Sequence, residues 1–202
     1  MRPQQHIFPA MLLAGCGLAA AAPLVSRASS AADLILAIMP TSGSCDGAQF
    51  PNECRTASQA SPFLIKSLSN FTVGEIAAML ALIGLESADM KFKHNVSPGR
   101  PGQGTSNMMS PNFVNEYAIS IFGSSAVAGK SPDEVLALVT PDDYNFGSAP
   151  WFYQTKCGAD VHSALKSGSD AGWAAYMGCI GVDPADAARL QYWNRAKTAF
   201  GL

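Results

Sequence analysis

The sequence lacks an excess of basic residues, and beyond residue 22 it lacks any long apolar run. A membrane-spanning helix needs about 20 apolar residues, so we expect no stable membrane insertion. Lys and Arg total 13 against 15 Asp and Glu, a balance that argues against a nucleic-acid-binding protein. No stretch alternates at period two, and no repeat or linker divides the chain. These absences leave an all-α fold in one domain as our prediction, and we expect a monomer.

The longest apolar run lies at the N-terminus and is typical of a secretion signal. One cation, Arg2, precedes an apolar run over residues 7–22 that proline and glycine interrupt. The run ends in alanines, the small side chains that signal peptidase requires before its cut. We predict a signal peptide over residues 1–22 and a secreted, extracellular protein. Residues 13–16 also match a bacterial lipobox, in which Cys16 would carry a lipid; the sequence leaves this alternative open.

Four cysteines remain after the leader, and an even number in an exported chain favours disulfides. They allow three pairings. We favour Cys45 with Cys54 and Cys157 with Cys179, because each pair closes a short local loop. No two cysteines have the close spacing of a zinc site, so we expect no metal and no other cofactor.

Two sequons for N-glycosylation follow in the exported part. They begin at Asn70 and Asn95. Both are candidate glycosylation sites if the secreting cell is eukaryotic.

Helix signals follow a stretch rich in Ser and Ala. We expect a flexible segment over residues 23–40 and one domain over residues 41–202. Thr72 and Glu75 form a capping box that opens a helix reaching about Ala88. Its apolar side chains surround the helix axis, so this helix is expected to be central and buried. Further helices are expected over residues 112–122, 131–139, 159–167, 170–180 and, after an Asp183 cap, 184–200.

Glu86 lies among apolar residues near the end of the predicted central helix. It follows Leu82 by four positions and Ile83 by three, so it shares their helix face. Desolvation disfavours a charged carboxyl, and a general acid near neutral pH must carry a proton. Glu86 is therefore a candidate general acid. The alternative interpretation is a glutamate at the surface or at the cap of the helix.

Three motifs occur in an order that resembles the lysozyme superfamily. Glu86-Ser87 is followed by a loop over residues 102–111 with the sequence Gly-Gln-Gly-Thr-Ser-Asn-Met-Met-Ser-Pro. Asp-Tyr-Asn-Phe-Gly follows at residues 143–147. This set resembles lytic transglycosylases and goose-type lysozymes, and the chain is also similar to fungal secreted muramidases of lysozyme-like fold. The resemblance implies an all-α, lysozyme-like catalytic domain.

The resemblance also implies roles for single residues. Glu86 would protonate the glycosidic oxygen of a peptidoglycan strand, the polysaccharide substrate of a secreted muramidase. Asn107 stands where the bacterial branch has glutamine, and an extra Ser110 precedes the loop's last proline. The residues that would bind the sugar are Gly102, Gly104, Asn107, Met108, Tyr144 and Asn145.

A second carboxylate, which glycoside hydrolysis ordinarily uses, is not identified by the sequence. Asp89, Asp142 and Asp143 are the candidates. Without one, the lytic route remains, in which a hydroxyl of the substrate attacks. The alternatives for function are a chitinase or chitosanase, or a non-catalytic secreted protein that binds glycans or a host factor.

A local group of basic residues lies on this otherwise acidic chain. His94 is close in sequence to Lys91, Lys93 and Arg100. Such a patch would attract the anionic peptide stems of peptidoglycan; the alternative is a solvated loop.

Overall fold

The computed structural model describes residues 30–202, and every named secondary-structure element in this range is helical. The prediction of an all-α fold is confirmed. The elements are α1 (Ala31–Ile38), η1 (Pro40–Gly43), α2 (Ala57–Leu68), α3 (Val73–Glu86), α4 (Pro111–Phe122), α5 (Ser124–Val127), α6 (Pro132–Val139), α7 (Asp142–Asn145), α8 (Ser148–Lys156), α9 (Ala159–Leu165), α10 (Asp170–Ile180) and α11 (Ala187–Phe200).

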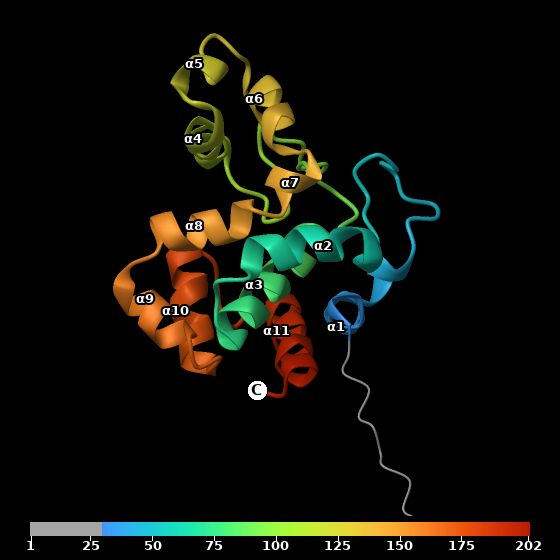
Figure 1. Cartoon of the computed structure of the whole chain (residues 1–202), viewed down its shortest axis with the longest axis vertical. Coiled ribbons are helices and arrows are strands. Elements are labelled where there is room, and N and C mark those ends of the chain that lie inside the picture. The colour runs from blue at the N-terminus through green and yellow to red at the C-terminus, as the bar shows by residue number, and fades with distance from the viewer. Residues whose placement is uncertain (1–29) are drawn as a thin grey trace, which may run out of the picture.

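Helix α3 lies in the middle of the molecule and packs extensively against α11 (Figure 1). Its N-terminus is the expected capping box: the Glu75 carboxylate accepts a hydrogen bond of 2.8 Å from the backbone N–H of Thr72. Gly84 allows the close approach of α11, because a Cβ atom there would lie 2.6 Å from the ring of Tyr192. The central, buried helix predicted from the sequence is confirmed.

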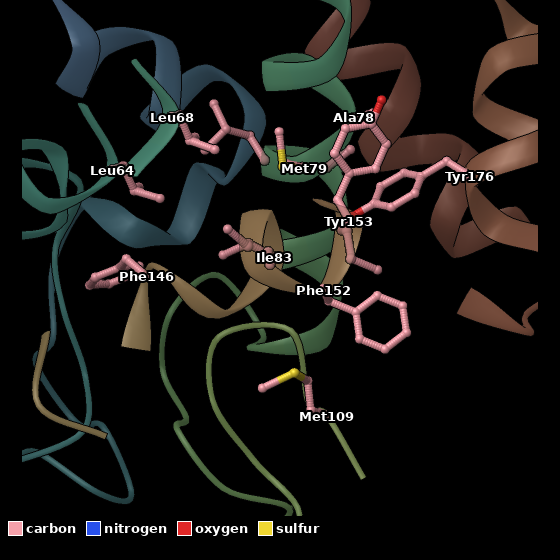
Figure 2. Close-up of a cluster of buried hydrophobic side chains, with 14 of the residues drawn as sticks. Leu64, Leu68, Ala78, Met79, Ile83, Met109, Phe146, Phe152, Tyr153 and Tyr176 are labelled. Carbon is pink, nitrogen blue, oxygen red and sulfur yellow. The ribbon is translucent and has the colours of Figure 1, made fainter. Parts of the chain in front are cut away.

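The core surrounds α3 with side chains from several helices (Figure 2). Met79 and Ile83 of α3 are fully buried, as is Tyr153 of α8, whose hydroxyl donates to the buried Glu75 carboxylate at 2.8 Å. Full burial of a side chain such as Ile83 contributes roughly 1.5 to 3 kcal/mol. Figure 1 places α4, α5 and α6 at one end of the molecule and α9 with α10 at the other.

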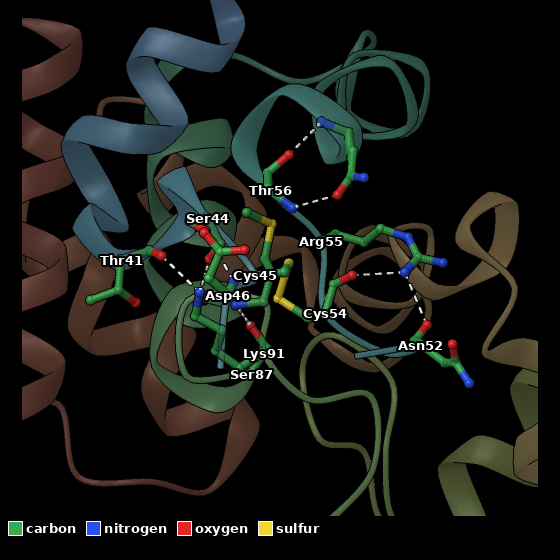
Figure 3. The surroundings of a disulfide bond; sticks show 12 residues. Thr41, Ser44, Cys45, Asp46, Asn52, Cys54, Arg55, Thr56, Ser87 and Lys91 are labelled. Carbon is green, nitrogen blue, oxygen red and sulfur yellow. Dashed lines mark hydrogen bonds between the residues drawn. A yellow bond between two sulfur atoms is a disulfide. The ribbon is translucent and has the colours of Figure 1, made fainter. Parts of the chain in front are cut away.

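Both predicted disulfides are present. Cys45 pairs with Cys54, and Cys157 pairs with Cys179. The first closes the loop between η1 and α2, where Figure 3 shows it among hydrogen bonds from neighbouring loops. The second joins the end of α8 to the last turn of α10.

The N-terminal part of the domain differs from our prediction. We expected a flexible segment over residues 23–40, but residues 31–38 form α1, which packs on α2 and α11. Ser30 and Asp33 form a capping box, and Ile35 and Ile38 are buried in the core. Burial of this apolar face explains why the segment is ordered.

Four further helices and one cap also differ from our prediction. Helices α2 and α8 and the short helices α5 and α7 were not foreseen. Helix α11 begins at Ala187 with Asp186, rather than Asp183, as its cap. The predicted signal peptide and the lipobox at Cys16 lie outside the described residues. Within residues 30–202, no helix is both long and apolar enough to cross a bilayer.

Candidate functional site

Glu86 ends α3 and forms an ion pair with Arg189 in the first turn of α11. Its Oε1 lies 2.7 Å from Nη2 of Arg189, and the two side chains are only 20% and 15% exposed. Because α3 and α11 touch at Gly84, the pair lies at the end of their contact. We expected Glu86 to be isolated among apolar groups; instead it is bound to a guanidinium group. The two charges partly neutralise each other in a half-buried place.

The backbone after Glu86 reverses through an unusual turn. Ala88, Asp89 and Met90 are consecutive non-glycine residues with positive φ angles of 50°, 57° and 64°. The buried hydroxyl of Ser87 donates to the carbonyl of Ile83 and accepts from the N–H of Met90. Such conformations cost energy and occur where surrounding contacts hold them. This turn directs the chain back along the molecule to the loops that surround Glu86.

A cavity of about 250 Å³, which we call the first cavity, opens at the ion pair. Its wall has a polar part and an apolar part. Nη1 of Arg189 is buried and has no hydrogen-bond partner within residues 30–202. A buried donor of this kind is normally satisfied, and Arg189 is one of the residues that line the first cavity. The lining residues are Glu86, Gln103, Asn107, Met108, Met109, Ser110, Phe113, Phe152, Ile180, Val182 and Arg189.

A second cavity of about 310 Å³ adjoins the first. Glu86, Gln103 and Met108 line both cavities, so they form a shared wall. His94 lines the second cavity. The remaining lining residues are Ala88, Phe92, Asn95, Val96 and Ser97.

Asn107 and Met108 are the predicted binding residues that line the first cavity beside Glu86. The Asn107 amide oxygen accepts from Thr105 and Ser148, so the side chain is fixed. The two predicted glycines of the loop serve packing. Gly102 donates its N–H to Asp133 at 2.7 Å, and a Cβ atom at Gly104 would lie 2.4 Å from the carbonyl oxygen of Lys93; neither glycine lines either cavity.

Tyr144 and Asn145 do not reach Glu86. The ring of Tyr144 packs edge-on against Phe122, and its carbonyl accepts from Tyr117. Asn145 is buried, its carbonyl accepts from Ser106 at 2.8 Å, and neither residue lines either cavity. The predicted role of Tyr144 and Asn145 in binding a sugar beside Glu86 is therefore not supported by their positions.

None of the three candidate second carboxylates lines a cavity at Glu86. Asp143 is exposed and pairs with Lys66 on the surface. Asp142 accepts from Lys93 at 2.6 Å and from Arg55 at 2.7 Å. Burial raises the pKa of Asp142, but these two hydrogen bonds outweigh it and hold the pKa below its ordinary value. The third, Asp89, is buried and hydrogen-bonded by Thr41 and Tyr192.

Two of the four residues in the predicted basic patch, Lys91 and Lys93, are engaged within the fold. Lys93 is buried with its ammonium group on Asp142, and burial lowers its pKa. Lys91 donates to the backbone carbonyls of Thr41 and Ser44 beside the first disulfide (Figure 3). These cations hold loops together and are not available for an anionic ligand.

His94 has a partner that the sequence did not reveal. Its Nδ1 lies 2.6 Å from Oε1 of Glu53, in the loop closed by the Cys45–Cys54 disulfide. The two residues are 41 positions apart, and no local motif marks the pair. Arg189 was missed for the same reason, since it lies 103 positions from Glu86.

The two sequons are in different surroundings. Asn70 is exposed in the turn between α2 and α3. Asn95 lines the second cavity, and its amide donates to Gln103 at 2.7 Å. A glycan on Asn70 is compatible with this exposed position, whereas the amide of Asn95 is already engaged with Gln103.

A separate cavity of about 230 Å³ lies between α1, α2, α3 and α11. Its wall is almost wholly apolar, with Ser61 and Ser69 as the polar side chains. It offers little hydrogen-bonding specificity in comparison with the first cavity. In the described part of the chain, no cluster of three or more His, Cys, Asp or Glu residues could hold a metal ion.

Comparison with known proteins gives a different indication from the motifs. No protein-family model matches the chain. A protein of Fusarium oxysporum (strain Fo5176), described as a bifunctional dioxygenase (DOX)-epoxy alcohol synthase (EAS), is 47% identical over 158 residues. The match covers 71% of this chain and only 12% of the Fusarium protein. The chain is therefore similar to a small part of a much larger enzyme.

This similarity contradicts the predicted muramidase function, because the similar protein is described as a dioxygenase and synthase and not as a peptidoglycan hydrolase. The prediction of a cell-wall hydrolase is thus wrong. The site gives a physical reason: Glu86 is paired with Arg189, and no second carboxylate lines either cavity.

Proposed function

We propose that this chain is a small-molecule-binding domain whose ligand lies in the first cavity. The observation that carries the proposal is the buried, unpartnered Nη1 of Arg189 beside Glu86. A ligand oxygen at this position would satisfy the donor, and the Glu86 carboxylate would accept from a ligand hydroxyl. The cavity thus offers a donor and an acceptor side by side.

The ligand we propose is an epoxy alcohol. An epoxide oxygen only accepts hydrogen bonds, whereas a hydroxyl group both donates and accepts. These two groups complement Arg189 and Glu86, respectively. Phe113, Phe152 and Ile180 supply an apolar wall for the carbon skeleton. The description of the Fusarium protein as an epoxy alcohol synthase supports this ligand class.

The matched length supports an accessory role. The similarity includes 12% of the Fusarium protein, while residues 30–202 here have their own core and disulfides. We therefore place the chain as a unit that binds such a compound, either alone or beside a catalytic protein. The lysozyme-like character of the fold is also part of our proposal, on the ground that Glu86 ends a central helix beside the glycine-rich loop. We also include in the proposal that the protein is exported after removal of residues 1–22, because the two disulfides favour an oxidising compartment.

Calorimetric titration tests the proposal. The full chain is titrated with epoxyhexanol, and hexanol serves as the analogue that lacks the epoxide. We expect epoxyhexanol to bind about tenfold more tightly, the difference that one well-placed hydrogen bond supplies. The double variant Glu86→Gln/Arg189→Met removes both charges and the guanidinium donor without changing the net charge, and it should lose the preference.

The matched control is Arg195→Met, because Arg195 also lies on α11 but stacks on Tyr192 and lines neither cavity at Glu86. It should bind epoxyhexanol as the unchanged chain does. Equal affinity for epoxyhexanol and hexanol, or an unchanged preference in the double variant, would rule out the proposed site.

A further inference from the structure

We propose that His94 is a general base that activates a water molecule in the second cavity, and that this water opens the epoxide ring of the bound ligand. This inference rests on the proposed function, since it requires an epoxy alcohol held at Arg189. It assigns a hydrolytic activity to the chain, namely conversion of an epoxy alcohol to a triol. Such a reaction consumes the class of product that an epoxy alcohol synthase makes.

His94 is held in the orientation that a base needs. Glu53 lies with Oε1 2.6 Å from Nδ1 of His94, while its Oε2 accepts the backbone N–H of Lys93 at 2.7 Å. The ring of Phe50 packs edge-on against the imidazole, with 4.8 Å between the ring centroids. Carboxylate, backbone and aromatic contacts together fix the imidazole plane.

The contact with Glu53 also selects the tautomer. A carboxylate accepts hydrogen bonds, so the proton of a neutral imidazole is on Nδ1. Nε2 then carries the free lone pair, and it has no hydrogen-bond partner within residues 30–202. A carboxylate that orients a histidine in this way is a recurring arrangement for general bases.

The cavities bring the base to the ligand. Glu86 and Met108 line both cavities, so a ligand anchored at Arg189 borders the space that His94 lines. At about 310 Å³, the second cavity has room for water molecules beside the ligand. The inference requires the epoxide to lie at the boundary between the two cavities, where one water molecule would contact both Nε2 and the epoxide carbon.

The reaction balances with water as the only co-reactant. Nε2 of His94 takes a proton from water, the water oxygen forms a bond to one epoxide carbon, and the ring C–O bond breaks. The resulting alkoxide accepts a hydrogen bond from Nη1 of Arg189 and then takes the proton back from the imidazolium of His94. Epoxide and water give a vicinal diol, no electrons are transferred, and the enzyme returns to its first state.

Product analysis in isotopically labelled water tests the inference on the full chain. We expect epoxyhexanol to yield a triol that carries one labelled oxygen. His94→Gln should lower the rate by about 100-fold, the usual contribution of a general base, and should leave epoxyhexanol binding within about twofold. His162→Gln is the matched control, because Nε2 of His162 already contacts the carbonyl of Tyr153 and His162 lines neither cavity.

Glu53 is a positioning residue, and nitrogen NMR of the imidazole reads its effect directly. At about pH 8, above the range in which histidine ordinarily titrates, the proton of His94 should be on Nδ1. In Glu53→Gln the two tautomers should mix, and kcat should fall more than KM rises. An Nε2-protonated imidazole in the unchanged chain would contradict the inference.

The outcomes separate the two proposals. Epoxyhexanol binding without triol formation above the uncatalysed rate overturns the role of His94 and leaves the binding site standing. Triol formation that His94→Gln does not slow also overturns it. Absence of epoxyhexanol binding overturns both proposals. Thermal unfolding followed by circular dichroism confirms that each variant is folded.

Discussion

Two carboxylates at the end of α3, Glu86 and Asp89, differ in how completely their surroundings satisfy them. Asp89 accepts from the N–H and hydroxyl of Thr41 at 2.9 and 2.8 Å and from the hydroxyl of Tyr192 at 2.6 Å. Glu86 has the ion pair with Arg189, whose Nη1 is still unpartnered among the residues described. All hydrogen bonds to Asp89 come from within the fold. At Glu86, the partner Arg189 keeps one donor without an acceptor among residues 30–202.

The two carboxylates have different roles: Asp89 stabilises the fold, and Glu86 belongs to the candidate site. Asp89 joins η1, α3 and α11 into one unit, and burial together with the bond to Asp89 raises the pKa of Tyr192 to about 12. Arg189 lies one turn earlier on α11, at the edge of the first cavity. The hydrogen-bonded contacts of Asp89 thus hold Arg189 in position beside the first cavity, as a preorganised binding site requires.

Asp89→Ala gives the largest expected effect. Three donors lose their acceptor, at about 1 kcal/mol or more each, so the free energy of unfolding should fall by about 3 to 4 kcal/mol. Urea unfolding measures it. Asp143→Ala, which removes only a surface ion pair with Lys66, should cost less than about 1 kcal/mol. Similar losses in the two variants would remove the distinction between Asp89 and an ordinary acid.

Gly84→Ala tests whether the α3–α11 contact sets the position of Arg189. The added methyl group would lie 2.6 Å from the ring of Tyr192, and such overpacking costs about 1 to 3 kcal/mol. We expect a matching loss in urea unfolding, together with weaker epoxyhexanol binding. Gly178→Ala on α10 meets no atom within 4 Å and should stabilise the protein by about 0.5 kcal/mol. Undiminished stability in Gly84→Ala would mean that α11 can shift without cost.

Asp142→Asn should change how stability depends on acid pH. The hydrogen bonds from Lys93 and Arg55 hold the pKa of Asp142 below its ordinary value in the folded state. Its stabilising contribution is therefore present above the unfolded pKa of about 3.9 and is lost as pH falls through the lower folded pKa. Urea midpoints from neutral pH to about pH 2 should fall less steeply in the variant. A variant curve parallel to that of the unchanged chain would show that Asp142 does not contribute.

Glu86→Gln/Arg189→Met should give the smallest change in stability. Replacement of both partners of a half-buried ion pair is often neutral, so we expect a difference of about 1 kcal/mol or less in urea unfolding. The same variant should lose its preference for epoxyhexanol. A large loss of stability would instead show that the Glu86–Arg189 pair stabilises the fold, as Asp89 does.

Local patterns in the sequence predicted much of the fold. The capping boxes at Thr72 and Ser131 marked the starts of α3 and α6, and loop length identified both disulfides. Helices α1 and α2 begin with the same kind of box, at Ser30 and Thr56, and the signal was present although we did not use it. Helix α8 has no side-chain cap and is ordered by the burial of its aromatic residues.

The site was predicted less completely because its pairs are distant in sequence. Glu86, Asn107 and Met108 were identified, and they do meet at the first cavity. Arg189 and Glu53 were not, since only the folded chain brings them to Glu86 and His94. A motif records neighbours along the chain, whereas the partner of Glu86 is supplied by a contact between two helices.

The loop between Cys45 and Cys54 gives the molecule a dependence on its redox surroundings. Phe50 and Glu53, which contact the His94 ring, both belong to this loop. Reduction of the disulfide would free the loop while leaving α3, α11 and the Glu86–Arg189 pair in place. The orientation of His94 thus depends on the oxidised disulfide. In a reducing compartment the chain would still fold, but the His94 ring in the second cavity would lose its fixed orientation.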